Sequence, residues 1–239
     1  MKSNIKYSVI MPYYDRIWQF RNTLDSFRRY YKDREDFEII VVEDFKNSTQ
    51  TEFHNGLMWM IHVYQKYMKV NYSLGPSVIT YNPVSLFNIG MALTRGRYVI
   101  LTSPECRHEV DVFQGLDKEF EENPDAYVIC GCMSIDRDGK FHKWYQHSIY
   151  RNGKYHFCSA LSKKICDQIG GFDERFAEGY GYDDDAFRNT LEQARIPFIL
   201  RNDLLVAHQH HDRIRPPWWR RLLEKNKKLY EDCQKRERL

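Results

Sequence analysis

Acidic side chains follow three of the apolar segments that the sequence predicts to be buried strands. In chain order they are Asp15 after residues 7–11 (YSVIM), Glu43 and Asp44 after 37–42 (FEIIVV), and Glu105 after 98–101 (YVIL). Ligands of open α/β sheets bind beyond the carboxyl ends of the strands. Carboxylates at that edge can hold a divalent cation or accept hydrogen bonds from the N–H and O–H groups of a ligand.

A second cluster that could bind a ligand is formed by histidines. His208, His210 and His211 stand within four residues, directly after the strand-like segment 197–206. A single histidine is more often structural, but three together, downstream of acidic loops, indicate a metal site. Imidazole nitrogen suits Mn²⁺ better than Mg²⁺, which prefers oxygen ligands.

A third candidate is the run of acids Asp183, Asp184 and Asp185, which opens a predicted helix. Acids at a helix N-terminus stabilise it through capping and through the helix dipole. Three in a row are more than a cap needs. The helix N-terminus is also expected to keep a carboxylate there ionised near neutral pH.

The elements that must position these residues alternate between strands and helices. The predicted strands are 7–11, 37–42, 98–101, 126–133 and 197–206, and the predicted helices are 15–31, 52–68, 85–94 and 110–122. Pro12 is expected to end the first strand. Short apolar strands that alternate with helices predict an α/β fold with a Rossmann-like, doubly wound and mostly parallel sheet.

Length and composition narrow the class of protein. A chain of 239 residues with 42% hydrophobic and 29% charged residues fits one folded domain with a tail. No apolar run approaches the roughly 18 residues of a membrane span, and no signal-peptide pattern opens the chain, so a cytoplasmic location is expected. The net charge of +3 is evidence against dominant nonspecific binding to nucleic acid. The turn MPYYDR contains no glycine, which is evidence against a dinucleotide or P-loop site.

From Tyr7 to about His211 the chain resembles family 2 glycosyltransferases with the GT-A fold, which are inverting enzymes. The resemblance rests on five segments in the family's order: SVIMPYYDR, EIIVVEDFKNS, NPVSLFNIGMALTRGRYVILTSPE, the galactosyltransferase-like GGFDERFAEGYGYDDDAF, and VAHQHH. It implies transfer of a sugar from a nucleotide donor, with a UDP-sugar favoured, to a hydroxyl of a glycan, lipid-linked or protein acceptor.

The resemblance also implies the donor and metal residues. The expected donor contacts are Pro12, Tyr14, Glu43, Asp44, Asn88 and Ser103. Where the family has a DxD motif, this chain has Ser103 in place of the first acid and Glu105 in place of the last. Glu105 is therefore the expected metal carboxylate, with His208 as the best nitrogen ligand and His211 as the second. The expected cofactor is a divalent metal, with Mn²⁺ favoured over Mg²⁺.

The acceptor side follows from the segment 179–184 (GYGYDD). The family's motif places the catalytic base at its second acid, which is Asp184 here, with Asp183 orienting the acceptor hydroxyls. Asp185 would take the role of base if the helix began one residue later. Tyr180, Gly181 and Tyr182 are expected to form a surface that a flat sugar ring can approach closely.

These inferences divide the chain into a GT-A domain, residues 1–212, and a basic amphipathic helix, residues 213–239. The donor half of the domain is expected at about 1–105 and the acceptor half at about 106–212. The tail can dock on the protein's own core, adhere to a membrane surface or contact an anionic acceptor, including nucleic acid. Two further functions stay open: glycosylation of modified DNA bases, and a catalytically inactive binding module on the same fold.

Overall fold

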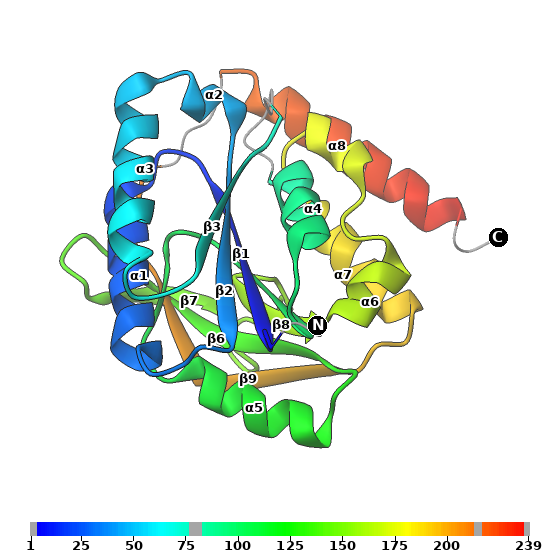
Figure 1. Cartoon of the computed structure of the whole chain (residues 1–239). Coiled ribbons are helices and arrows are strands. Elements are labelled where there is room, and N and C mark those ends of the chain that lie inside the picture. The colour runs from blue at the N-terminus through cyan, green and yellow to red at the C-terminus, as the bar shows by residue number, and fades with distance from the viewer. Residues whose placement is uncertain (1–3, 77–82, 213–216, 237–239) are drawn as a thin grey trace.

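The computed structural model describes residues 4–76, 83–212 and 217–236 (Figure 1). Within these residues, the strands are β1 (Tyr7–Tyr13), β2 (Phe37–Glu43), β3 (Val70–Leu74), β4 (Tyr98–Thr102), β5 (Cys106–His108), β6 (Tyr127–Ile135), β7 (Phe141–Gln146), β8 (Cys158–Ser162) and β9 (Phe198–His208). The helices are α1 (Ile17–Tyr31), α2 (Phe45–Ser48), α3 (Thr51–Tyr64), α4 (Val84–Leu93), α5 (Val112–Glu122), α6 (Lys163–Ile169), α7 (Asp183–Gln193) and α8 (Trp219–Arg236), with a 3-10 helix η1 at Glu174–Glu178.

All strands of the described part join one sheet. Its order is β3-β2-β1-β4-β8-β6-β9-β5, and β7 pairs with β6 outside this path. β1, β2, β3, β4, β6 and β9 run in one direction, whereas β5, β7 and β8 run against them. The fold is therefore the mostly parallel α/β sheet that the sequence predicted, with a reversed strand, β8, inserted near its centre.

The central strands are buried on both faces. In β1, Val9 and Met11 join the hydrophobic core beneath α1, α3 and α5, and Ile10 joins a second core beneath α4, α6 and α7. Figure 1 shows α1 and α3 on one side of the sheet, and α4, α6 and α7 on the other. Every residue of β2 and β4 is buried, which explains the continuous apolar runs of these two strands.

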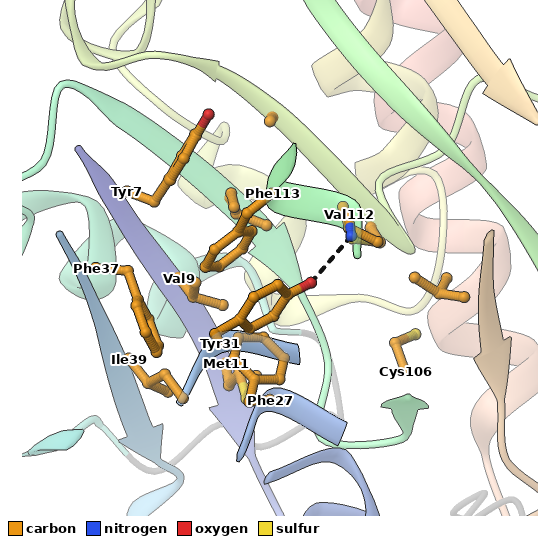
Figure 2. Close-up of a cluster of buried hydrophobic side chains, with 14 of the residues drawn as sticks. Tyr7, Val9, Met11, Phe27, Tyr31, Phe37, Ile39, Cys106, Val112 and Phe113 are labelled. Atoms are coloured by element: carbon orange, nitrogen blue, oxygen red, sulfur yellow. Dashed lines mark hydrogen bonds between the residues drawn. The ribbon is translucent and has the colours of Figure 1, made fainter. Parts of the chain in front are cut away.

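An aromatic cluster between α1 and α5 contacts β5, the short strand that directly follows the loop 103–105. The rings of Tyr31 in α1 and Phe113 in α5 stack with their centroids 4.0 Å apart. The Tyr31 hydroxyl accepts a hydrogen bond from the Val112 N–H at 3.1 Å (Figure 2) and lies 2.6 Å from His108 Nδ1 in β5. Because β5 follows the loop directly, these contacts fix where the loop ends.

Most predicted boundaries are shifted by one or two residues, and two of the differences have a clear physical meaning. β1 runs through Pro12 to Tyr13 instead of ending at the proline. Since β4 pairs with β1 only as far as Ile10, Pro12 lies where β1 has one partner strand, and a strand tolerates a missing N–H there. The helix predicted at 52–68 ends at Tyr64, which leaves room for β3, a short strand that the sequence analysis did not identify.

The C-terminal helix α8 packs against the rest of the chain. Leu229 and Tyr230 pack against the core beneath α7, and the Tyr230 hydroxyl accepts a hydrogen bond from Asn189 at 2.8 Å. Part of the apolar face of α8 is therefore covered by the protein itself. Residues 213–216 and 237–239 of the predicted tail lie outside the described residues. Among the described helices, none combines the length and apolar character needed to cross a membrane.

Candidate active site

A cavity of about 490 Å³ lies at the carboxyl edge of the sheet, where the ends of β1, β2, β4 and β9 meet the start of α7. Most of the residues predicted for the site line it: Pro12, Tyr14, Asp44, Ser103, Glu105, Tyr180, Gly181, Asp183, Asp184, His208 and His211. Glu43, Asn88 and Tyr182 do not. The fold thus gathers residues from the whole length of the domain into one space.

Glu105, His208 and His211 converge on one side of this cavity, and their ligand atoms all lie within 4.8 Å of one another. Glu105 Oε1 is 3.8 Å from His208 Nε2 and 3.6 Å from His211 Nε2. Two ligands of one ion, each about 2.1 Å from it, lie roughly 3.0–3.4 Å apart, so small side-chain rotations would let all three share a cation. The donor set of one carboxylate and two imidazoles is one that can hold a divalent cation.

The local backbone explains why these three residues meet. β5 and β9 are antiparallel, with Cys106 opposite His208, and the Gln209 N–H donates to the Glu105 carbonyl at 2.9 Å. This pairing places the acid at the start of β5 beside the histidines at the end of β9. His210 lies outside the group, with its Nε2 3.8 Å from Asp212.

The acidic pair at the end of β2 divides into two roles. Glu43 is fully buried, and its carboxylate accepts hydrogen bonds from Asn47 and, at 2.8 Å each, from His54 Nδ1 and the Tyr72 hydroxyl. Asp44 lines the cavity and caps α2 by accepting from the Lys46 N–H at 2.7 Å. Only Asp44 is therefore placed to meet a ligand in the cavity.

Asn88 and Tyr182 also lie outside the cavity lining, and each makes contacts that support the site. The Asn88 side chain donates to the Phe172 carbonyl at 2.9 Å and accepts from the Phe172 N–H at 2.8 Å, which ties α4 to the loop before η1. Tyr182 precedes α7 in a left-handed conformation with φ of 65°, and its ring lies 5.5 Å from that of Tyr230.

Asp183 and Asp184 open α7, and both line the same cavity as Glu105. Burial, together with the charge of its neighbour Asp184, raises the pKa of Asp183 to about 7. Burial and the charge of Asp185 likewise raise the pKa of Asp184 to about 7. The helix N-terminus does not hold the pKa of either acid at the usual value for aspartate, because burial and the neighbouring charges outweigh the helix dipole.

Asp185, the alternative base, lies differently. Its carboxylate is 3.1 Å from the Arg188 guanidinium one turn further along α7, and it does not line the cavity. Of the three acids in the first turn of α7, Asp183 and Asp184 line the cavity and Asp185 does not.

Sequence analysis missed His156, which lies just before β8. Its Nδ1 is 3.1 Å from Asp184 Oδ1. The imidazole is enclosed by rings, with that of Phe87 at 5.1 Å and that of Phe172 at 4.9 Å, both edge-on. Burial lowers the pKa of His156 to about 4, so the ring is neutral at pH 7. Arg16, Tyr145, Arg151 and Tyr155 also line the cavity and carried no sequence signal that would have identified them.

Comparisons with known proteins bear on the fold. No family model and no curated protein matches the chain. The crystal structure of residues 1–349 of TarS from S. aureus, in complex with UDP-GlcNAc, superposes with a TM-score of 0.67 at 13% identity, over 88% of this chain and 60% of that one. The mannosyltransferase PcManGT from Pyrobaculum calidifontis, in complex with GDP-Man and Mn²⁺, gives 0.60 at 14% identity, over 84% and 56%.

This chain therefore spans about 60% of the length of the TarS fragment that it matches. At such low sequence identity the likeness concerns the fold. The mixed sheet and its covering helices form the GT-A fold that the sequence resemblance implied.

Proposed function

We propose that this protein is a metal-dependent, inverting glycosyltransferase that moves a sugar from a UDP-sugar to a hydroxyl of a glycan, lipid-linked or protein acceptor. The observation that carries the proposal is that one cavity holds both a candidate metal group, Glu105 with His208 and His211, and a carboxylate with a pKa near neutral, Asp184. A binding module without activity would need neither. The GT-A fold and the nucleotide sugars bound to TarS and PcManGT support the same class of donor.

In this proposal the donor lies along the ends of β1, β2 and β4. Asp44 accepts hydrogen bonds from the uracil N–H or the ribose hydroxyls, because a carboxylate offers only acceptors. Pro12 and Tyr14 contact the nucleoside, and Ser103 offers a hydroxyl to the ribose where the family has an acid.

The diphosphate is directed toward Glu105, His208 and His211. A divalent ion held by these residues would neutralise the charge that the diphosphate develops as it leaves. We favour Mn²⁺ because two of the three ligands are imidazoles. Arg16 and Arg151 also line the cavity and bring further positive charge to it.

Asp184 acts as the general base. The acceptor oxygen attacks the anomeric carbon, the bond from that carbon to the diphosphate breaks, and the hydroxyl proton passes to the Asp184 carboxylate. A base works best when its pKa is close to the operating pH, and the pKa of Asp184 is about 7. His156, whose Nδ1 lies 3.1 Å from Asp184 Oδ1, orients this carboxylate, and Asp183 orients the acceptor hydroxyls.

A thermal-shift panel of nucleotide sugars tests the donor assignment. A ligand that binds only the native state raises its melting temperature. We expect UDP-sugars with Mn²⁺ to give the largest rise, with a smaller one for guanine and adenine nucleotides, and a loss of the rise in excess chelator. Equal shifts for all nucleotides, or no shift with any of them, would contradict the proposal.

A further inference from the structure

Asn226, in the middle of α8, is fully buried although it is a polar residue on a mostly solvated helix. Its side-chain Nδ2 donates two hydrogen bonds, to the Phe176 carbonyl at 3.0 Å and to the Gly181 carbonyl at 2.8 Å. Phe176 lies within η1, and Gly181 lies in the loop that leads from η1 to α7. One amide group of the C-terminal helix therefore ties η1 and this loop together.

Gly179 makes this close approach possible. A Cβ atom added at position 179 would lie 1.7 Å from Asn226 Oδ1 and 2.1 Å from its Cγ. The φ of Gly179 is −123°, which other residues adopt freely, so it is the contact with Asn226, not the backbone conformation, that requires glycine here.

The same loop contacts α8 at further points. The Tyr180 N–H donates to the Leu222 carbonyl at 3.2 Å, and the Tyr180 ring lies 6.1 Å from that of Trp219. The Lys225 ammonium lies 2.6 Å from a Glu178 carboxylate oxygen. Since Tyr180 and Gly181 line the cavity, α8 backs the part of its wall that leads directly into Asp183 and Asp184.

We propose that Asn226 is a positioning residue: through its two hydrogen bonds, the C-terminal helix sets the acceptor side of the active site. Asn226 fixes Tyr180 and Gly181, which form the acceptor surface, and it fixes the start of α7, which carries the base. The donor residues at the ends of β1, β2 and β4 lie outside this contact. The acceptor role rests on the proposed function, whereas the support of the loop by α8 does not.

The test compares three variants with the wild type: Asn226→Ala, Gly179→Ala and the double variant. Displacement of a reacting group by about 1 Å can cost about 10²-fold in rate, so we expect each single variant to lower kcat/KM for the acceptor by up to about 100-fold. The UDP-sugar dissociation constant and its Mn²⁺ dependence stay as in the wild type. Lys228→Ala, an exposed position on the same helix, is the matched control and keeps full activity.

The double variant separates this specific contact from general damage. Asn226→Ala removes the atoms that a Cβ at position 179 would meet, so Gly179→Ala should cost much less in the Asn226→Ala background than alone. Additive losses would overturn the proposed contact. Equal losses of donor binding and acceptor transfer would overturn the acceptor-side role and indicate general destabilisation.

A second readout does not depend on activity. Hydrogen exchange at the Tyr180 amide, which is bonded to Leu222, should be faster in Asn226→Ala than in the wild type, and unchanged in Lys228→Ala. Unchanged exchange in Asn226→Ala would overturn the support of the loop. If the wild type transfers no sugar while this exchange result holds, the proposed function fails and the support of the loop by α8 stands.

Discussion

His156 Nδ1 lies 3.1 Å from Asp184 Oδ1, and the imidazole that makes this contact is enclosed by phenylalanine rings. Burial lowers the pKa of His156 to about 4, whereas burial and the charge of Asp185 raise the pKa of Asp184 to about 7. At neutral pH the contact therefore joins a neutral imidazole to a carboxyl group that is close to half ionised. In the proposed mechanism Asp184 accepts the proton, and His156 lies where it can orient the carboxylate.

The pH dependence of transfer follows from these values. Asp184 accepts a proton only when ionised, so kcat should fall as the pH drops through about 7. His156→Phe keeps a ring in place but removes the nitrogen that lies 3.1 Å from Asp184 Oδ1, and with it a polar neighbour that can favour the ionised carboxylate. We expect the His156→Phe change to raise the pH at which kcat is half-maximal by roughly one unit. His156→Gln, which keeps a donor, should raise it less. If the half-maximal pH is the same in His156→Phe as in the wild type, the contact does not affect the base.

Replacement of the three acids one at a time tests the identity of the base. Asp184→Asn should lower kcat by about 10²–10⁴-fold, with UDP-sugar binding retained. Asp185→Asn is the matched control, since its carboxylate pairs with Arg188, and it should keep most of the activity. The assignment is wrong if Asp184→Asn turns over normally while Asp183→Asn or Asp185→Asn does not.

The candidate metal group of Glu105, His208 and His211 has a matched control in His210, which lies between the two histidines in the sequence. Glu105→Gln and His208→Ala should each raise the Mn²⁺ concentration needed for half-maximal activity by at least about 10–100-fold. His210→Ala should not, because His210 faces Asp212 and lies outside the group. Titration of activity with Mn²⁺ after chelator treatment measures this, and an equal effect of all three changes would argue against the group.

Glu43 and Asp44 should give opposite results. Glu43→Ala leaves three donors without their acceptor, those of Asn47, His54 and Tyr72. Loss of the acceptor from buried donors costs about 1–3 kcal/mol of unfolding free energy, which urea denaturation would measure. Asp44→Ala should mainly weaken UDP-sugar binding. Donor affinity that falls with Glu43→Ala at unchanged stability would reverse the two roles.

The sequence predicted the edge of the sheet at which the site lies, because acids and histidines follow apolar runs and the strands are parallel. The sequence did not show which of Glu43 and Asp44 lines the cavity. Adjacent residues at a strand end point in different directions, and which of them meets the cavity depends on Asn47, His54 and Tyr72 from the next elements.

Residues brought in by distant segments were not predictable in this way. His156 precedes a strand that the periodicity did not identify, and its importance comes only from its distance to Asp184 in α7. The amphipathic pattern of α8 was compatible with docking on the protein's own core, but it did not identify Asn226 as the residue bonded to Gly181.

The most direct measurement of the central claim is proton NMR of an α-linked UDP-sugar incubated with the protein and Mn²⁺. The anomeric signal of the transferred or released sugar is read before mutarotation. If the protein is an inverting glycosyltransferase with Asp184 as its base, the donor signal should decrease only when the metal is present. The β-anomer should then be the first product to appear. Neither change should occur in Asp184→Asn. First appearance of the α-anomer, or no cleavage of any UDP-sugar in the presence of Mn²⁺, would contradict it.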